Sequence, residues 1–558
     1  MSTKRKKAAK TAASKRPNNS ITFTEEQEAI LRTEVASGEI LLIQAIAGSG
    51  KTATVLEYML RRPESEFLYL SFNRDAALEA GKRSKALGIK NVTCSTIDAL
   101  ARKDLTILFM PKFKSEFIPD WKAWLAAQGP TMAELLEQAQ IKKHINAVWL
   151  TINRYAYSDA REMTATNEDV LLHARQIWSA IETRRIYCPS FAWNCKMVAE
   201  RRRLLTDFDW TSKSKDDNTE PEPKRPITHV IVDEAQDINW PMLKLIMNQI
   251  AVPVAIIFCG DPYQHLYSFR HCISVFTDVD FSERFGIAAP QVLQLSKSVR
   301  FGPVIAQAAT AVLNHLVEGH PKAVIGTLNE LRDDKVAHLT LSPAELRQMI
   351  PNILARNTGE LALLFRTNRE LFETFVAFDG IECVTKSDEL KKFNKLHKQF
   401  IADKMGFMQA YEKQLWVAEH GTDDDAGEDE TEEDVSERRD EALYLYQFIS
   451  SSPSAVVKRV TERIEASHRL HKCRCILSTI HRAKGLEYDS VILSRDVAEY
   501  ESIKLYHYNK KKRALEQDGL GSKASVRKEA KALNDFYFLK YTGVTRAKYQ
   551  LWIIVKPT

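Results

Sequence analysis

Short, continuous runs of hydrophobic residues recur along the chain, and segments with helical spacing separate them. The runs lie at residues 40–44, 67–72, 229–232, 254–258, 361–365, 490–493 and 550–555. A short run without polar alternation is typical of a strand buried on both faces, as in a parallel sheet. Strands that alternate with helices predict an α/β fold, in which helices cover both faces of a parallel sheet. Because the pattern begins again in the second half, we predict two such cores with a boundary near residue 275.

Two long segments interrupt this alternation of strands and helices. Residues 106–175 have a helical pattern and contain Trp, and residues 375–470 form the second interruption. We expect each to be a mainly helical insertion in one core. The cores themselves would then comprise residues 21–105 with 176–275, and residues 276–374 with 471–558.

The composition is that of an ordinary folded protein. Of the 558 residues, 44% are hydrophobic and 27% are charged, which excludes collagen-like, disulfide-scaffold and wholly disordered chains. No hydrophobic run reaches the roughly 18 residues that a membrane-spanning helix needs, so we expect no membrane. The N-terminus has no hydrophobic stretch typical of a secretion signal. The eight cysteines form no Cys-x-x-Cys pair, and we expect them to be reduced inside a cell.

The net charge of +6 conceals two opposite segments. Residues 1–20 carry seven Lys or Arg and no acidic residue, which predicts a disordered tail. Three roles stay open for that tail: binding phosphates, directing nuclear import, or neither. Residues 422–437 carry ten carboxylates and no base, which predicts a solvated loop. Setting both segments aside leaves the rest of the chain at +9, a balance that suits salt-sensitive binding to a phosphate backbone.

A glycine-rich turn follows the first hydrophobic run. Residues 45–52 read Ala-Ile-Ala-Gly-Ser-Gly-Lys-Thr, the phosphate-loop pattern Gly-x-x-x-x-Gly-Lys-Ser/Thr with alanine in the first position. Gly48 and Gly50 let backbone N–H groups surround a phosphate, and the helix expected after the turn adds its dipole. Lys51 would reach the β and γ oxygens of ATP, and the Thr52 hydroxyl would bind Mg²⁺. The residues expected to contact the nucleotide here are Ala47, Gly48, Ser49, Gly50, Lys51 and Thr52.

A pair of acidic residues follows the third predicted strand. The buried run 230–232 leads directly to Asp233 and Glu234 at the mouth of the strand. Asp233 is placed to hold Mg²⁺ through water, and Glu234 is placed to orient and deprotonate the attacking water. Together with the phosphate loop, this pair predicts an ATP-hydrolysing site with ATP and Mg²⁺ as cofactors.

The phosphate loop and the sequence Asp-Glu-Ala-Gln-Asp at 233–237, in this order, resemble superfamily 1 DNA helicases of the UvrD/Rep/PcrA type. Further segments agree in the family's order, at 24–27, 72–77, 96–98, 260–270, 298–300, 365–368, 478–488 and 541–548. Gly-Asp-Pro-x-Gln at 260–264 and Ser-Val-Arg-Phe at 298–301 are most similar to the F-box DNA helicase branch. We expect no F-box ahead of the first motif, where only about twenty residues precede it.

The resemblance implies two RecA-like cores with the nucleotide between them. It implies that Gln27 reads adenine, that Gln264 senses the γ-phosphate, and that Glu487 contacts nucleotide and couples to DNA. Arg300 and Arg546 are expected to be arginine fingers, which stabilise charge on the transferred phosphoryl group. The candidate DNA contacts are Phe72, Thr96, Tyr267, Phe269, Arg366 and His481. Among these, the three aromatic residues would stack on bases.

Several features depart from the family pattern, among them residues 535–538, where Asp-Phe-Tyr-Phe replaces the usual Glu-Glu-Arg-Arg. Val299 replaces the tyrosine that stacks on adenine, which leaves base selection to Gln27. Asp98 replaces a histidine near the DNA. The insertion at 375–470 is often a regulatory domain in the family. Here it is about half the usual size, which argues against autoinhibition by it.

These observations predict an ATP-dependent helicase that moves 3′→5′ on single-stranded DNA, in repair, recombination or replication. Two alternatives share every motor residue: a translocase that strips proteins from DNA, and the motor subunit of a larger nuclease or defence complex. A silent adaptor is disfavoured by the intact phosphate loop and acidic pair. We expect a monomeric motor that binds single strands and duplex junctions, with a nuclease, recombinase or clamp as open protein partners. We expect it in the cytoplasm at the nucleoid, with the nucleus as the alternative.

Overall fold

A computed structural model shows how the predicted strands assemble. It describes residues 22–72, 74–101, 141–182, 195–196, 199, 226–248, 254–266, 271–317, 323–327, 334–385, 389–420, 443–467, 470, 473–517 and 523–555. The basic tail, the acidic run at 422–437 and the first part of the predicted first insertion lie outside these residues.

The first core is a six-stranded parallel sheet with the strand order β3-β2-β4-β5-β1-β6. Its strands are β1 (Ile40–Ala45), β2 (Phe67–Ser71), β3 (Val92–Thr96), β4 (His229–Asp233), β5 (Ala255–Gly260) and β6 (Gln291–Leu295). The four strands in the middle are the four predicted hydrophobic runs, and nearly all of their residues are buried. The two outer strands, β3 and β6, were not predicted, and their side chains are mostly only partly covered.

The position of β6 shows that the predicted boundary at residue 275 is wrong. β6 pairs with β1 in register, with Leu41 opposite Gln291 and Ala45 opposite Leu295. The first core therefore extends beyond the predicted boundary to the end of β6. The pattern concealed this because an edge strand needs no continuous hydrophobic run.

The second core is another six-stranded parallel sheet, with the order β11-β12-β10-β13-β14-β9. Its strands are β9 (Lys335–Leu339), β10 (Leu361–Phe365), β11 (Val384–Thr385), β12 (Cys475–Thr479), β13 (Tyr488–Leu493) and β14 (Ala547–Ile554). A short two-stranded sheet, β7 (Lys297–Ser298) with β8 (Ile325–Gly326), lies between the two cores in sequence. The predicted α/β fold with parallel sheets is confirmed.

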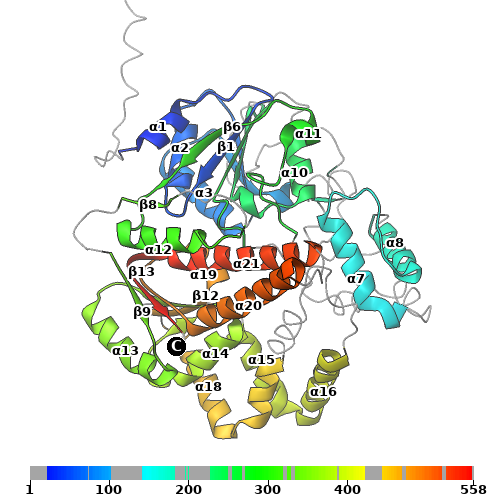
Figure 1. Ribbon diagram of the computed structural model, residues 1–558, viewed down its shortest axis with the longest axis vertical. Helices are drawn as coiled ribbons and strands as arrows, with labels where there is room; N and C mark the ends of the chain where they lie inside the picture. Colours follow the sequence, from blue (N-terminus) through cyan, green and yellow to red (C-terminus); the bar gives the residue numbers. More distant parts are fainter. Residues whose placement is uncertain are drawn as a thin grey trace, which may run out of the picture.

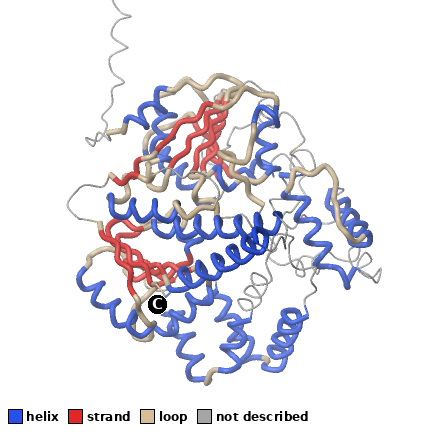
Figure 2. Tube along the Cα trace, viewed as in Figure 1, coloured by secondary structure: helices blue, strands red, loops and turns tan. Residues whose placement is uncertain are grey.

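Helices cover both sheets, and Figure 2 shows the strands as two separate groups with helices around them. Those of the first half are α1 (Glu25–Arg32), α2 (Lys51–Leu60), α3 (Arg74–Ala86), α7 (Ile141–Tyr157), α8 (Glu168–Glu182), η1 (Ala235–Asp237), α10 (Trp240–Met247) and α11 (Phe281–Phe285). Those of the second half are α12 (Pro303–Leu313), α13 (Pro343–Arg356), α14 (Asn368–Ala377), α15 (Glu389–Ala402), α16 (Lys404–His420), α18 (Ser454–Ser467), α19 (Ile480–Ala483), α20 (Arg495–Gln517) and α21 (Lys523–Val544).

The two predicted insertions behave differently. In the first, α7 and α8 pack on each other around Ile152 and Trp178 and form a hydrophobic cluster of their own, at the side of the molecule in Figure 1. This helical pair continues to Glu182, past the predicted limit of residue 175. In the second, β11 joins the sheet itself, and Phe393 and Val457 pack into the same cluster as Leu363. The predicted limit at 375 is therefore wrong, because residues up to Thr385 belong to the second sheet.

Hydrophobic contacts join the two cores. Ile46, Ala47 and Leu266 of the first core belong to one buried cluster with Phe301 and Tyr541 of the second half. Among the described residues, no helix is long and apolar enough to cross a membrane. The cysteines within the described ranges carry free thiols.

Candidate functional site

The phosphate loop lies between β1 and α2, where residues 46–50 leave the sheet and Lys51 begins the helix. Gly48 and Gly50 have φ angles of 73° and 78°, in the left-handed region that suits glycine. A Cβ on Gly48 would lie 2.5 Å from both Arg300 Cβ and Ser298 Oγ. Glycine is needed here because the segment after β7 packs directly on the loop.

The buried side chain of Gln27 in α1 is hydrogen-bonded to the phosphate loop. Its side-chain amide donates to the carbonyl of Ser49 at 3.2 Å, and its Oε1 accepts from the backbone N–H of Thr24 at 2.9 Å. Thr24 in turn caps α1 by accepting from the backbone N–H of Gln27. The predicted contact between Gln27 and adenine remains a prediction, and the structure shows a second role for this buried amide.

Lys51 and Glu234 form an ion pair in the centre of the site. Lys51 Nζ lies 3.1 Å from Glu234 Oε1, and both side chains are mostly buried. Burial alone would lower the pKa of Lys51, but Glu234 and Asp233 raise it above its usual value. Burial alone would raise the pKa of Glu234, but Lys51 and Lys484 lower it to about 2. Both groups therefore stay charged near neutral pH, as a phosphate ligand and a general base require.

Asp233 lies beside Glu234 at the end of β4. Its two oxygens accept hydrogen bonds from the Tyr69 hydroxyl and from the backbone N–H of Glu234, the latter at 2.9 Å. Burial and the neighbouring Glu234 raise the pKa of Asp233. A cation is the natural partner of such a crowded pair of carboxylates. With the partly exposed Thr52 at the start of α2, the oxygen donors fit Mg²⁺.

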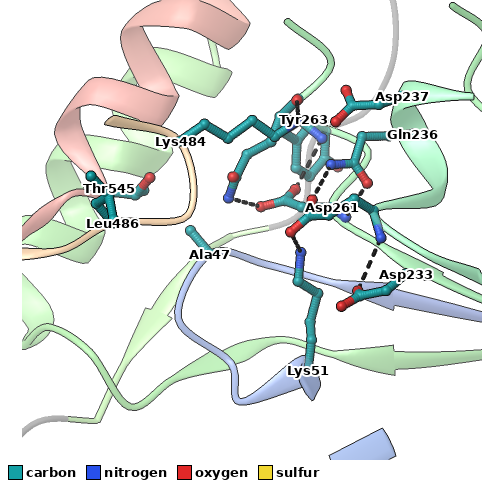
Figure 3. A network of polar contacts seen from close by, with 12 residues as sticks. Ala47, Lys51, Asp233, Gln236, Asp237, Asp261, Tyr263, Lys484, Leu486 and Thr545 are labelled. Atoms are coloured by element: carbon teal, nitrogen blue, oxygen red, sulfur yellow. Dashed lines mark hydrogen bonds and ion pairs between the residues drawn. The ribbon is translucent and has the colours of Figure 1, made fainter. Parts of the chain in front are cut away.

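A polar network links Glu234 to the end of β5. Glu234 Oε2 accepts from the Gln236 side chain at 2.6 Å, and Gln236 Oε1 accepts from the backbone N–H of Asp261 at 3.1 Å. Asp261 then accepts from the Gln264 side chain at 2.8 Å. Figure 3 shows Gln236 and Asp261 of this network above Lys51. The predicted γ-phosphate sensor Gln264 is therefore connected to the base Glu234 through two intervening residues.

The second core contributes two arginines that the sequence predicts. Arg300 Nε donates to Glu487 Oε2 at 2.9 Å, and its Nη1 donates to the carbonyl of Thr545 at 3.0 Å. Glu487 also pairs with Lys548 at 2.7 Å. Glu487 is thus joined to one predicted arginine finger, and its contact with nucleotide remains a prediction.

Arg546 is buried, with 1% of its surface exposed. Its guanidinium donates to three neutral oxygens, the carbonyls of Thr542 and Leu486 and the hydroxyl of Thr545. Burial, followed by the neighbouring Arg300, lowers the pKa of Arg546 to about 9. No carboxylate pairs with it among the described residues, so an incoming anion would stabilise this charge.

Two further residues cross between the cores, and sequence reasoning assigned no role to either. Lys484 forms an ion pair with Asp237 and donates to the carbonyl of Gln264 at 2.9 Å. Burial raises the pKa of Asp237 to about 6 although Lys484 opposes this shift. The Tyr541 hydroxyl contacts both Ala47 and Asp261. Each lies inside a recognised motif, but only the packing of the cores reveals its partners.

Four of the six candidate DNA contacts lie within the described residues. Phe72 packs partly buried against the first core, and Thr96 Oγ1 accepts from the backbone N–H of Ala99 at 3.1 Å. The guanidinium carbon of Arg366 lies 3.8 Å from the centroid of the Tyr500 ring. Burial, with Lys484 and Arg366 nearby, lowers the pKa of His481 to about 4, so its ring is neutral. Tyr267 and Phe269 lie outside the described residues.

The structure therefore brings most predicted nucleotide residues to one site between the cores. Those joined by hydrogen bonds, ion pairs or close electrostatic contact are Lys51, Asp233, Glu234, Gln264, Arg300, Glu487 and Arg546. Arg366 and His481 lie together on the second core, and the electrostatic effect of Lys484 reaches both His481 and Glu234. Two of the six candidate DNA contacts, Arg366 and His481, thus lie near Lys484, which contacts the Gln264 segment of the site.

Comparison with known proteins shows which family of proteins the chain is similar to. A model of the UvrD/REP helicase N-terminal domain matches residues 23–277, and one of the UvrD-like helicase C-terminal domain matches residues 458–558. The chain is 22% identical to F-box DNA helicase 1 of Gallus gallus over 520 residues, which covers 85% of this chain and 45% of that protein. It is 24% identical to F-box DNA helicase protein 1 of Schizosaccharomyces pombe over 572 residues, which covers 95% and 57%. The chain spans about half the length of these relatives.

Proposed function

Because the chain belongs to the UvrD-like helicase family, we propose that it is an ATP-driven motor that moves 3′→5′ along single-stranded DNA and unwinds duplex DNA. The observation that carries the proposal is the contact between the cores, where Glu234 of the Lys51–Glu234 pair interacts electrostatically with the buried Arg546 of the other core. Both relatives named above are called DNA helicases, which agrees with DNA as the substrate.

Placing half of the site on each core couples hydrolysis to motion. MgATP would supply the phosphoanhydride bond whose hydrolysis drives the cycle. Lys51 and Thr52 would bind the phosphates and the metal, Glu234 would take the proton from water, and Arg300 and Arg546 would stabilise the developing charge. Arg546 can reach that charge only when the cores are close, so closure accompanies hydrolysis and reopening accompanies release.

The deciding experiment measures ATP hydrolysis with and without single-stranded DNA, in wild type and in Lys51→Ala. We expect DNA to stimulate wild-type turnover, and we expect Lys51→Ala to reduce it by about 100-fold or more, because the β and γ oxygens lose their ligand. Lys85→Ala, an exposed lysine on α3 of the same core, is the matched control and should keep wild-type turnover. Wild-type turnover that ignores DNA would contradict the proposal.

Direction is tested separately, by strand displacement on duplexes with a 3′ tail or a 5′ tail. We expect displacement from the 3′-tailed duplex alone. Preference for the 5′ tail would contradict the proposed direction. Stimulated hydrolysis without any displacement would point to removal of proteins from single strands.

A further inference from the structure

We propose that Tyr541 is a positioning residue that fixes the phosphate loop, the Gln264 segment and the arginine finger Arg546 relative to one another where the two cores meet. This inference deepens the proposed function and rests on it, because it assigns the group that sets the geometry of the hydrolytic site. No role was predicted for Tyr541 from its place in the sequence.

Tyr541 joins segments that lie far apart in the chain. It lies in α21 of the second core, and its side chain is fully buried. Its hydroxyl accepts from the backbone N–H of Ala47 at 3.3 Å and donates to Asp261 Oδ2 at 3.2 Å. Both partners belong to the first core, one in the phosphate loop and one after β5. One oxygen atom therefore contacts two functional segments of the opposite core.

The same hydroxyl is connected to Gln264. Asp261 Oδ2 accepts from the Tyr541 hydroxyl and also from the Gln264 side chain, the latter at 2.8 Å. Burial and the neighbouring Asp261 raise the pKa of Tyr541 far above its usual value, so the phenol keeps its proton and remains a donor. A displacement of Tyr541 would therefore move the hydrogen-bond acceptor that orients the predicted γ-phosphate sensor.

Tyr541 and Arg546 are close in the chain, so the position of Tyr541 also determines the position of Arg546. The carbonyl of Tyr541 accepts from Thr545 through both its backbone N–H, at 3.0 Å, and its hydroxyl, at 2.9 Å. Arg546 Nε donates to the carbonyl of Thr542 at 3.0 Å. The last turn of α21 and Arg546 thus form one hydrogen-bonded unit. Anchoring Tyr541 on the phosphate loop sets how far the Arg546 guanidinium stands from Lys51.

The substitution Tyr541→Phe isolates the hydroxyl, because the ring keeps its packing against Tyr263, 6.0 Å away between centroids. The matched control is Tyr488→Phe. Tyr488 is a buried tyrosine of the same core, and its hydroxyl has no hydrogen-bond partner among the described residues. Both substitutions remove one buried oxygen, but only Tyr541→Phe releases the contact between the cores.

We expect Tyr541→Phe to lower the kcat of DNA-stimulated ATP hydrolysis by about tenfold, since small displacements of catalytic groups have large effects on rate. We expect the KM for ATP to change by less than about twofold, because Gln27 still holds the loop through Ser49 and Lys51 keeps its partner Glu234. Tyr488→Phe should match wild type in both constants. A wild-type kcat in Tyr541→Phe, or an equal fall in both variants, would overturn the proposal.

A second measurement does not need ATP turnover. Urea unfolding of Tyr541→Phe, Asp261→Asn and the double variant forms a double-mutant cycle. We expect the two substitutions to be coupled, so that together they cost less stability than their separate effects predict. If the two losses of stability simply add, the proposed contact between Tyr541 and Asp261 is refuted, even if the protein still hydrolyses ATP. Conversely, a coupled cycle in a chain without DNA-stimulated turnover would refute the proposed function and retain the contact.

Discussion

Gly48 and Gly88 share a backbone conformation but differ in what surrounds them. Their φ angles are 73° and 74°, where a side chain costs roughly 1 kcal/mol or more. A Cβ on Gly88 would meet nothing within 4 Å, whereas one on Gly48 would lie 2.5 Å from Arg300 and Ser298. Substituting alanine at Gly88 therefore measures the backbone strain alone. The same substitution at Gly48 adds a steric clash at the contact between the cores.

We expect Gly48→Ala to lower the free energy of unfolding by about 2–4 kcal/mol, because overpacking adds to the backbone strain. Its ATP turnover should fall severely, since Arg300 is pushed away from the loop. Gly88→Ala should cost about 1 kcal/mol and keep wild-type turnover. Urea unfolding and steady-state ATPase assays measure both effects. Equal turnover in the two variants would show that Arg300 does not need to lie against the loop.

At the scale of single elements, two helices begin with the same capping box but only one touches the nucleotide site. Thr24 and Gln27 cap α1, and Ser342 and Glu345 cap α13. Each box satisfies two backbone N–H groups at a helix start. Gln27 additionally holds the carbonyl of Ser49 in the phosphate loop. The first cap is thus part of the site, and the second is a matched structural control.

We expect Thr24→Ala and Ser342→Ala each to cost about 1 kcal/mol of stability. Only Thr24→Ala should also raise the KM for ATP, by about threefold, because Gln27 loses its fixed orientation beside the loop. Steady-state ATPase assays over a range of ATP concentrations give the KM. An equal KM in the two variants would show that the α1 cap does not support nucleotide binding.

The strands that the pattern did not predict share a physical property. β3, β6 and β9 each lie at an edge of a sheet, where one side of the strand lacks a neighbour and most side chains are only half-buried. Their sequences therefore mix polar with hydrophobic residues, and no continuous run forms. β12 is the exception, because it is buried in the middle of its sheet yet ends in the polar residues Ser478 and Thr479, which shorten the hydrophobic run. Central strands were predictable because burial on both faces demands hydrophobic side chains.

At the scale of the whole molecule, charge is divided between segments. The ten carboxylates of residues 422–437 offset a formal charge of +9 on the rest of the chain after the basic tail, residues 1–20, is also set aside. We expect deletion of 422–437 to tighten binding of single-stranded DNA about threefold or more at low salt, and the gain to shrink as salt rises. Fluorescence anisotropy with a labelled oligonucleotide measures this change. Unchanged affinity would leave the segment as a spacer.

A matched variant separates charge from length in that experiment. Replacing residues 422–437 with a neutral Gly/Ser linker of equal length removes the ten carboxylates and keeps the spacing. We expect it to bind DNA as tightly as the deletion does. Tight binding by the deletion alone would show that length, not charge, limits access to the DNA surface.

The sequence by itself determined all the central strands except β12, the phosphate loop and the acidic pair, because each depends on neighbouring residues. Burial on both faces requires the run before Lys51, and the turn requires glycine, so local chemistry encodes both. The tertiary structure alone decided the extent of the first core, the burial of Arg546 and the contacts of Lys484 and Tyr541. These features depend on how two sheets pack together. Tyr541 and Ala47 are 494 residues apart, and no local pattern brings such residues into contact.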